Sequence, residues 1–258
     1  MRITALVENT AADRRFGAEH GLSLYIETGA HILLFDMGQT GLFAENAAKL
    51  GVDLRDVDIA VLSHGHYDHG GGLKRFLEIN QSAPVYMSRH AFEPHYNATG
   101  RYNGLDASLR DNERFRFTDD HAVIGEGLTL CACNGRARNH DLGSFGMEAE
   151  RNGVRAPDDF RHEQYLLIEE NGKKTLFSGC SHKGILDIVQ WLKPDVLVGG
   201  FHFSTLPLDE TLRAYAAYLD RFHTDFYTCH CTGAAQFAFM KESMHRLFYL
   251  STGQTIHI

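Results

Sequence analysis

The stretch Val61-Leu62-Ser63-His64-Gly65-His66-Tyr67-Asp68-His69-Gly70-Gly71-Gly72-Leu73 places three imidazoles and one carboxylate within six positions. An apolar, β-branched run from Asp58 to Ser63 precedes the first imidazole, and the run from Leu73 to Ile79 has helical spacing. The motif is therefore predicted to be a loop that leaves the end of a buried strand. Neutral imidazole nitrogen and carboxylate oxygen are ligands of divalent first-row metals, so the stretch predicts metal binding.

The spacing within the motif favours two cations over one. In an extended backbone His64 and His66, two residues apart, project to the same side. Asp68 and His69 follow a turn and can face a second point. Two-metal sites hold their cations about 3.5 to 4 Å apart, which suits this arrangement. The alternative is a His-rich surface loop, but the strand, turn and helix context favours a metal site.

Five other stretches carry histidine, cysteine or acidic residues beside glycine. They are Glu19-His20-Gly21-Leu22-Ser23, Leu34-Phe35-Asp36-Met37-Gly38, Gly179-Cys180-Ser181-His182-Lys183-Gly184-Ile185, Gly199-Gly200-Phe201-His202 and Cys229-His230-Cys231-Thr232-Gly233. With the motif they resemble the metallo-β-lactamase superfamily, and within it the metal-dependent hydrolases related to dihydropterin ribofuranosylaminobenzene 5'-phosphate synthase. The resemblance runs from near Thr4 to near Gly233. Met37 departs from it, since we expect Thr there in this branch, and the change affects packing more than chemistry.

The resemblance implies an α+β fold, a four-layer αββα sandwich with a dinuclear metal site at one edge. We expect a single domain over residues 1–258, with an insertion around residues 88–160 at the rim of the site. The part from residue 88 to about 120 is polar and aromatic, and it is too long for an ordinary connection. Arg89, Arg101 and Arg110 in this part are candidates to meet an anionic group. A variable surface excursion is the alternative reading of the insertion.

Local patterns predict the elements of this fold. Gly21 to Glu27 and His31 to Asp36 are predicted to form a hairpin. A second hairpin is predicted from residues 160–168 and 174–178, because Asn171-Gly172 between two apolar runs is a strong turn signal. The spacing of apolar residues predicts helices over residues 40–50, 184–192, 212–222 and 235–248.

The resemblance also implies a set of metal ligands. The third nitrogen ligand of the first metal is open between His182 and His162. We favour His182, because Glu163 and Gln164 replace the Pro-Gly spacing that normally positions the earlier histidine. A buried, small hydrophobic residue is the alternative role of Cys180. The implied ligands are His64, His66, Asp68, His69, Cys180 at the bridging position, His182, and His230 as the last ligand of the second metal.

Other residues at predicted strand ends are candidates for catalysis or substrate binding. His202 is predicted to act as a general acid, a substrate clamp or a metal neighbour, with a packed histidine as the alternative. Glu19 and His20 precede the second strand and are candidates for substrate contact, although such a pair is more often structural. His162 is a further candidate for substrate contact if it is not a ligand. The resemblance implies that Asp36 supports the metal histidines through hydrogen bonds.

The composition is that of an ordinary globular protein, with 43% hydrophobic and 22% charged residues among 258. A net charge of -8 without clustered Lys or Arg argues against a nucleic-acid partner. Five cysteines do not suggest a disulfide framework, and Cys229 and Cys231 are predicted to be packing residues. Met1 to Phe16 lacks the apolar run of a signal peptide, and no stretch reaches 18 apolar residues. We expect a cytoplasmic protein without a membrane partner, and we leave a homo-oligomer open.

The two-metal geometry predicts hydrolysis. Two divalent cations would generate a hydroxide from a shared water and stabilise the developing oxyanion. Asp68 would ligate the second metal and hold the hydroxide, while His182 or His202 protonates the leaving group. The resemblance argues against redox chemistry, because relatives with two irons carry Glu in place of His66 and add a flavin domain. Cys180 as a ligand favours zinc, with iron and manganese as alternatives.

Three classes of function follow from these observations. The first is a metal-dependent hydrolase of a small anionic ester, such as a phosphoester or a lactone. The second is a transferase that, like the relative, joins a reduced pterin to an aminobenzene ribose phosphate. The third is a metal-holding binding protein without turnover. Fold resemblance alone cannot choose among them.

Overall fold

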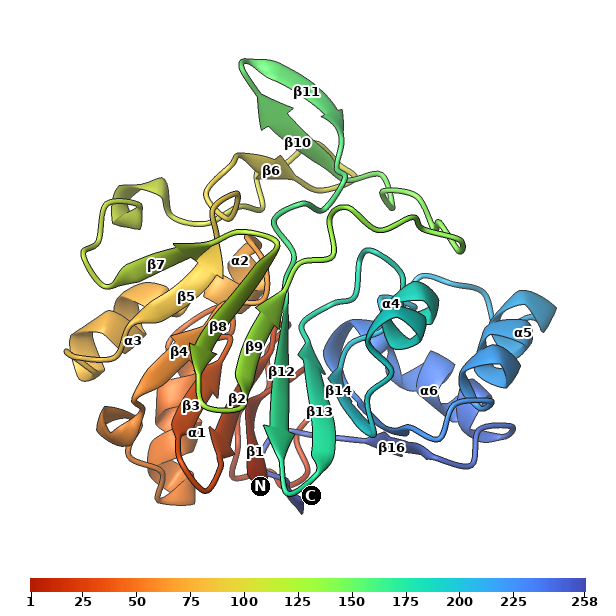
Figure 1. Ribbon diagram of the computed structural model, residues 1–258, viewed down its shortest axis with the longest axis horizontal. Helices are drawn as coiled ribbons and strands as arrows, with labels where there is room; N and C mark the ends of the chain where they lie inside the picture. Colours follow the sequence, from red (N-terminus) through yellow and green to blue (C-terminus); the bar gives the residue numbers. More distant parts are fainter.

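Two seven-stranded sheets form the centre of the protein in a computed structural model, which describes residues 1–258 (Figure 1). In the order of hydrogen-bonded neighbours, the first sheet consists of β17 (Thr255–His257), β1 (Arg2–Val7), β2 (Ser23–Glu27), β3 (Ile32–Phe35), β4 (Ile59–Val61), β5 (Val85–Ser88) and β7 (Phe115–Thr118). The second consists of β16 (Leu247–Tyr249), β15 (Asp225–Thr228), β14 (Val196–Gly199), β13 (Lys173–Ser178), β12 (Tyr165–Glu170), β9 (Leu128–Cys131) and β8 (His121–Gly125). A small third sheet contains β11 (Val154–Pro157), β10 (Glu148–Arg151) and β6 (His95–Tyr96).

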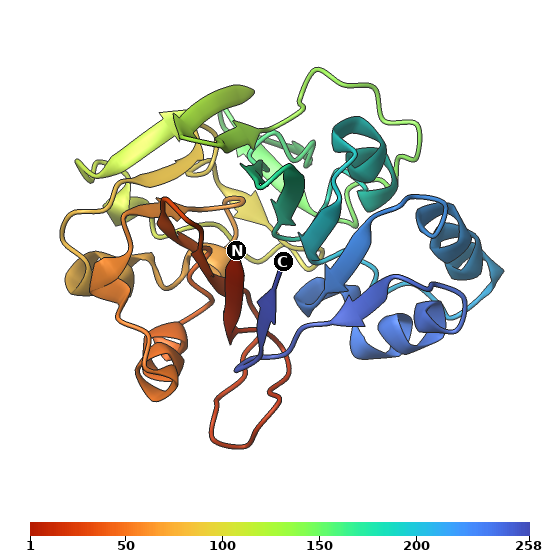
Figure 2. The same cartoon turned by 60° about the horizontal axis from the view of Figure 1, so that its bottom comes forward.

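The helices lie outside the two large sheets. The α-helices are α1 (Leu42–Leu50), α2 (Tyr67–Gly70), α3 (Leu73–Ile79), α4 (Ile185–Leu192), α5 (Glu210–Leu219) and α6 (Ala234–Lys241). Three short 3-10 helices are η1 (Leu54–Asp56), η2 (Ala107–Leu109) and η3 (His230–Thr232). None of the helices has the length and apolar character that crossing a bilayer requires. The two chain ends lie side by side because β17 pairs with β1 (Figure 2).

Side chains of the central strands alternate between two apolar interfaces, so each sheet is covered on both faces. In β3, Leu33 and Phe35 face the other sheet, whereas Leu34 faces the helices outside. In β13, Phe177 faces the first sheet and Leu176 faces the helices on the opposite side. Three hydrophobic clusters result: one between the first sheet and α1 and α3, one between the sheets, and one beneath α4, α5 and α6. The predicted αββα sandwich is confirmed.

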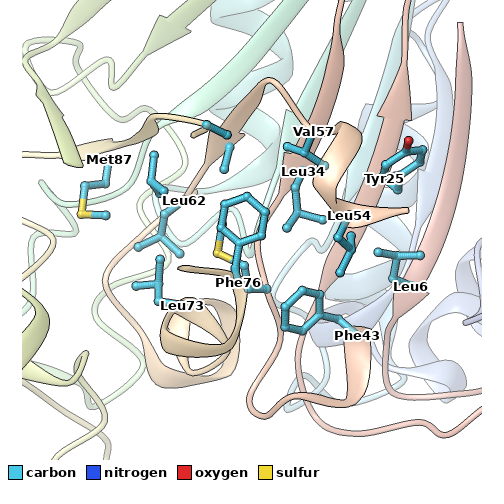
Figure 3. Packing of buried hydrophobic residues seen from close by; sticks show 14 of the residues in the cluster. Leu6, Tyr25, Leu34, Phe43, Leu54, Val57, Leu62, Leu73, Phe76 and Met87 are labelled. Atoms are coloured by element: carbon cyan, nitrogen blue, oxygen red, sulfur yellow. The ribbon is translucent and has the colours of Figure 1, made fainter. Parts of the chain in front are cut away.

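The cluster outside the first sheet anchors the segment that carries the metal motif. Phe43 of α1 and Leu73 and Phe76 of α3 pack against Leu6 and Leu34 of the strands (Figure 3). Leu73 directly follows the glycine run of the motif and is fully buried. Burying a side chain of this size contributes roughly 1.5 to 3 kcal/mol. The apolar face of α3 therefore fixes the exit of the motif, as β4 fixes its entry.

Parallel pairing gathers the chemically active residues at one edge of the sandwich. β3 and β4 are parallel in the first sheet, as are β13, β14 and β15 in the second. Asp36 follows β3 and the motif follows β4, while Cys180, His202 and His230 follow β13, β14 and β15. The small sheet of β6, β10 and β11 lies beyond α2 on this side of the molecule (Figure 1).

Both predicted hairpins are confirmed, since β2 pairs with β3 and β12 pairs with β13 in antiparallel fashion. In the second turn Asn171 has a φ of 53° and Gly172 a φ of 74°. A two-residue hairpin turn with both φ values positive matches the twist of the strands, and Asn and Gly adopt it at low cost. The local sequence signal was therefore sufficient here.

One predicted boundary is wrong. The last helix, expected over residues 235–248, ends at Lys241, and Leu247–Tyr249 forms β16 beside β15. A few apolar residues suit a short strand as well as a helix, and the open edge of β15 decides for the strand. Within the predicted insertion around residues 88–160, strands β7, β8 and β9 belong to the two large sheets. The two long segments outside these sheets are residues 89–114 and 132–164.

Replacing Phe177 with Ala should destabilise the fold by about 3 to 5 kcal/mol, because the fully buried ring packs against Phe35 between the sheets at a centroid distance of 5.8 Å. Urea unfolding followed by circular dichroism measures the free energy of unfolding. The matched control is Phe117→Ala, whose ring is 44% exposed and whose loss should cost at most about 1 kcal/mol. Equal losses in the two variants would contradict the layer assignment.

Candidate metal centre

The motif loop lies directly against neighbouring backbone, and its glycines make this contact feasible. A Cβ atom on Gly65 would collide with the carbonyl oxygen of Ala91, and one on Gly72 would collide with that of Met37. Because only glycine lacks this atom, the motif can be held from both sides. Met37 itself is fully buried in the outer cluster, so its departure from the expected Thr concerns packing.

Ligand atoms of three residues lie close to Nε2 of His69. These three residues and His69 form what we call the second cluster: Asp68, His69, Cys180 and His230. The Nε2 atom of His69 is 3.1 Å from Nε2 of His230 and 3.2 Å from Sγ of Cys180. Oδ2 of Asp68 is 3.6 Å and 3.3 Å from the same two nitrogens. Ligand atoms bound about 2.1 Å from one tetrahedral metal lie roughly 3.4 Å apart. The spacing of the second cluster therefore matches the ligands of a single cation.

Hydrogen bonds behind the two imidazoles turn their free nitrogens toward each other. His69 donates through Nδ1 to Oδ2 of Asp36 at 2.7 Å, and His230 donates through Nδ1 to Oδ1 of Asn9 at 2.7 Å. In neutral rings both Nε2 atoms then carry lone pairs, and these face each other at 3.1 Å. Such an arrangement is repulsive unless a proton or a metal cation lies between the two nitrogens.

Protons compete with a metal for the second cluster. Although burial opposes it, the Asp36 carboxylate raises the pKa of His69 to about 9. Burial raises the pKa of the Cys180 thiol well above its ordinary value. Because metal ligands must be deprotonated, a cation entering this cluster would displace both protons.

The Asp36 carboxylate also controls His64. Its Oδ1 accepts the backbone N–H of Ser63 at 2.7 Å, and its Oδ2 accepts the Ser63 hydroxyl at 2.7 Å. The Ser63 oxygen in turn accepts from Nδ1 of His64 at 2.8 Å. One fully buried carboxylate thus sets the orientation of His64 and His69 together.

A second group of imidazoles, the first cluster, consists of His64, His66 and His182, with ligand atoms within 4.8 Å of one another. The Nε2 atoms of His64 and His66 are buried and have no hydrogen-bond partner. His182 donates through Nδ1 to Oε2 of Glu163 at 2.8 Å, which leaves its Nε2 as a lone pair. A carboxylate behind a ligand histidine is the usual support in metal sites.

Electrostatics keep the first cluster in the form that binds metals. Burial lowers the pKa of His64 and His66 well below the ordinary value, and it lowers the pKa of His182 as well. These rings are therefore neutral near pH 7, and neutral imidazole is the ligand form. Although burial opposes it, the hydrogen bond from His182 holds the pKa of Glu163 below its usual range.

His162 does not join either cluster. Its Nδ1 accepts the backbone N–H of Gly65 at 2.9 Å, and its Nε2 donates to Oδ2 of Asp158 at 3.2 Å. The same oxygen accepts from Nδ1 of His95 at 3.0 Å. Both ring nitrogens of His162 are therefore occupied, and the residue supports the motif loop. This geometry favours neither of its predicted roles, which were the third nitrogen ligand of the first metal and a contact with substrate.

The two residues of the predicted pair, Glu19 and His20, have different surroundings. The Glu19 carboxylate accepts the backbone N–H groups of Gln39 and Thr40, both at 3.0 Å, so it holds the loop before α1. It does not line the pocket, so this geometry favours a structural role for Glu19 over the predicted contact with substrate. His20 does line the pocket, where its Nε2 lies 3.2 Å from Oδ2 of Asp68.

A pocket of about 250 Å³ opens over both clusters. The two predicted catalytic residues, Asp68 and His202, line it, and Nδ1 of His202 is buried without a hydrogen-bond partner. Cys231 is buried, as expected of a packing residue, and it also contributes to the pocket lining. Cys229 is fully buried between the sheets, as predicted.

Several residues at the site have a left-handed backbone conformation. Asp36, Ser181, His202 and His230 have φ values of 60°, 60°, 56° and 49°. Left-handed backbone is uncommon outside glycine and costs on the order of 1 kcal/mol per residue. All four follow the ends of parallel strands, where the turn directs the chain across the edge of the sandwich.

The donor set as a whole fits two divalent cations. The first cluster offers three neutral imidazoles, and the second offers two imidazoles, a carboxylate and a thiol, all of them zinc, iron or manganese ligands. The predicted metal ligands are therefore brought together by the fold, while their roles stay predictions. They are His64, His66 and His182 in the first cluster, and Asp68, His69, Cys180 and His230 in the second.

Comparison with known proteins agrees with the fold and with the motif. The family model described as "Metallo-beta-lactamase superfamily" matches residues 16–219, which is most of the chain. The chain belongs to the metallo-beta-lactamase superfamily. The resemblance read from the sequence is thereby confirmed at the level of the superfamily.

Two relatives of this superfamily member come from Methanocaldococcus jannaschii. An uncharacterized protein is 29% identical over 240 residues, which cover 90% of each chain. The second, 7,8-dihydropterin-6-methyl-4-(beta-D-ribofuranosyl)-aminobenzene-5'-phosphate synthase, is 26% identical over 291 residues, which cover 99% of this chain and 96% of the relative. The similarity to a protein of the predicted branch therefore spans nearly the whole superfamily domain.

Among solved structures, Tm1679, a metal-dependent hydrolase of the beta-lactamase superfamily, has a TM-score of 0.85 and 28% identity. The match covers 100% of this chain and 99% of Tm1679. Zinc-bound PqqB from Methylobacterium extorquens has a TM-score of 0.62 at 13% identity, with complete coverage of both chains. The second structure shows that the fold is shared and nothing more.

Sequence reasoning missed three residues that complete the site. Asn9 holds His230 from the end of β1, and Glu163 holds His182 from just before β12. Glu163 lies beside His162 in the sequence, a signal that could have marked it as a supporting carboxylate. Asn103 lines the pocket from the insertion. No local pattern marks Asn103, because its place depends on a contact with the motif far away in sequence.

Replacing His182 with Ala should remove roughly one of two metals per chain, because it deletes a free Nε2 from the first cluster. The control is His162→Gln, whose amide can accept from Gly65 and donate to Asp158, so metal content should stay unchanged. Elemental mass spectrometry of both purified proteins measures the metal content. A loss of metal in His162→Gln with none in His182→Ala would overturn the ligand assignment.

Replacing Asp36 with Ala should weaken metal binding by about 10- to 100-fold, because His69 and His64 both lose the support that orients them. The matched variant is Ser63→Ala, which interrupts only the branch to His64 and should have a smaller effect. Competition with a chromogenic chelator measures metal affinity in both. An effect of Ser63→Ala as large as that of Asp36→Ala would contradict the branched arrangement.

Proposed function

We propose that this member of the metallo-beta-lactamase superfamily is a hydrolase that cleaves a small ester, such as a lactone or phosphoester, at a dinuclear metal centre. One observation carries the proposal: Nε2 of His69 lies within 3.1 to 3.6 Å of ligand atoms of His230, Cys180 and Asp68. A ring nitrogen of His64, whose Nε2 is unpaired, lies within 4.8 Å of the ligand atoms of His69 and Cys180. Both clusters line or underlie a single pocket of about 250 Å³.

The chain's own residues organise the reaction in this proposal. Two bound divalent cations supply an activated water and stabilise negative charge on the substrate oxygen. The Asp68 carboxylate lines the pocket beside the second cluster. It accepts a hydrogen bond from the attacking water and orients it. One bond forms from the water oxygen to the acyl or phosphoryl centre, and the ester bond to the leaving oxygen breaks.

His202 is the residue proposed to protonate the leaving oxygen. His182 is less suited to this step, because Glu163 holds its Nδ1 and its other nitrogen belongs to the first cluster. The ring centroids of His202 and His182 are 4.4 Å apart, and Nδ1 of His202 has no hydrogen-bond partner. One proton of the consumed water thus reaches the leaving group, and the acid product releases the other at neutral pH.

Zinc is the metal that the donor set favours. Cys180 places a thiolate donor 3.2 Å from Nε2 of His69, and soft sulfur ligands favour zinc over manganese.

The wild-type protein, purified without chelator, is expected to contain two metals per chain and to hydrolyse carboxylic esters, lactones or phosphoesters from a chromogenic panel. Replacing His202 with Gln should lower kcat by about 10²- to 10⁴-fold while metal content is retained. Elemental mass spectrometry and steady-state kinetics give the two readouts. Less than one metal per chain, or two metals with no turnover of any ester, would count against the proposal.

A second candidate is a transferase that joins a reduced pterin to an aminobenzene ribose phosphate. It is supported by the synthase relative, whose similarity covers 99% of this chain. The pocket argues against it, because 250 Å³ is small beside the roughly 300 to 1,000 Å³ of pockets that hold one drug-sized ligand. Turnover that requires both organic substrates, and does not occur with any single ester, would favour the transferase.

A further inference from the structure

The pocket wall above the metal clusters contains no lysine or arginine. Apart from the residues of the two clusters, the lining is supplied mainly by neutral side chains, among them Asn97, Asn103, Ser204 and Thr205, with Met147 as an apolar contact. A phosphate dianion is normally met by arginine or lysine, often through paired hydrogen bonds. This wall offers neither.

The arginines of the rim are engaged elsewhere. Arg89 pairs with Asp119 at 2.6 Å, and Arg151 forms a salt bridge with Asp159. Arg161 pairs with Glu93, and none of these three arginines lines the pocket. Arg101 and Arg110, singled out in the sequence as candidates to meet an anion, do not line it either. The rim therefore places no positively charged side chain in the pocket.

Asn103 is the neutral wall residue with an unsatisfied polar atom, in addition to the proposed acid His202. Its side chain is 7% exposed, and its Oδ1 is buried without a hydrogen-bond partner. Its backbone is fixed on both sides, since its N–H donates to the carbonyl of His95 and its carbonyl accepts from the N–H of Tyr67, both at 2.9 Å. Tyr67 immediately precedes the ligand Asp68, so the motif itself places this amide beside the metal clusters.

An unpaired buried amide oxygen costs about 1 to 3 kcal/mol, which a hydrogen bond from a ligand recovers. An amide group carries an acceptor oxygen and donor hydrogens, and a hydroxyl both donates and accepts. A hydroxyl therefore pairs with Asn103 whichever way the amide is turned. It is also a small neutral group, which suits a pocket of about 250 Å³.

We infer that the substrate is a small carboxylic ester or lactone, uncharged away from the bond that is cleaved, with a hydroxyl group that hydrogen-bonds to Asn103. The inference rests on the proposed hydrolase function and narrows it. In the lactone case, water adds its oxygen to the carbonyl carbon, the ring acyl–oxygen bond breaks, and the ring oxygen gains a proton as a second hydroxyl. The inference predicts that phosphate monoesters are poorer substrates than such lactones.

The first test compares γ-butyrolactone with its α-hydroxy and β-hydroxy derivatives, using metal-loaded wild type and Asn103→Ala. Wild type should show a kcat/KM at least tenfold higher for one hydroxylated lactone than for the parent, and higher than for phenyl phosphate. In Asn103→Ala the ratio between hydroxylated and parent lactone should fall to about one. A higher kcat/KM for phenyl phosphate, or an unchanged ratio in the variant, would overturn the inference.

The matched control is Asn97→Ala on the same rim. The Oδ1 of Asn97 already accepts from the N–H groups of Thr99 and Arg101, at 3.0 Å and 3.1 Å, so it has no need of a ligand. The preference for the hydroxylated lactone should persist in this variant. Its loss in both variants would show that any change in the rim removes the preference, and the specific role of Asn103 would be refuted.

A second readout does not depend on turnover. Hydrolysis-resistant 3-hydroxy-2-pyrrolidinone and its parent 2-pyrrolidinone are titrated into the metal-loaded protein and followed by ligand-observed NMR. The hydroxylated lactam should bind at least tenfold more tightly to wild type, and equally to its parent in Asn103→Ala. If this holds while no ester is cleaved, the hydrolase proposal fails and the recognition by Asn103 stands. If lactones are cleaved but neither preference depends on Asn103, the inference alone fails.

Discussion

The carboxylate of Asp36 is the interaction on which the rest of the site depends. It is fully buried at the end of β3, and it accepts hydrogen bonds from Ser63 and His69, which belong to the segment after β4. Through the Ser63 hydroxyl it also controls His64. Parallel pairing of β3 and β4 brings the carboxylate to the motif, so the sheet and the metal clusters are stabilised by the same contacts.

Histidines in both clusters are oriented by a hydrogen bond to an oxygen behind the ring, and each of these oxygens comes from a different part of the fold. Asn9 after β1 holds His230, and Glu163 before β12 holds His182. In each case one imidazole nitrogen donates to an oxygen behind it, and the other is turned toward the cluster. Because these oxygens come from both sheets, the sandwich must be assembled before the lone pairs converge. Folding and metal binding are therefore expected to be coupled.

The chemistry of the rim differs from that of the floor. The floor concentrates imidazoles, a carboxylate and a thiol, whereas the wall above it presents an asparagine amide, hydroxyls and a methionine without a basic residue. The basic side chains of the rim form ion pairs with acidic neighbours outside the pocket. The metals would therefore supply the charge for catalysis, and neutral hydrogen bonds would supply selectivity.

Local patterns in the sequence were sufficient to predict the two hairpins, because the Asn171-Gly172 turn depends only on local φ values. The sandwich fold and the residues of the floor followed from the resemblance of the motifs to the superfamily. The sequence left the choice between His182 and His162 open, since this choice depends on which ring nitrogens are already occupied by Glu163, Gly65 and Asp158. Strand β16 and the pocket residues Cys231 and Asn103 likewise emerged only in three dimensions, because contacts between distant segments place them.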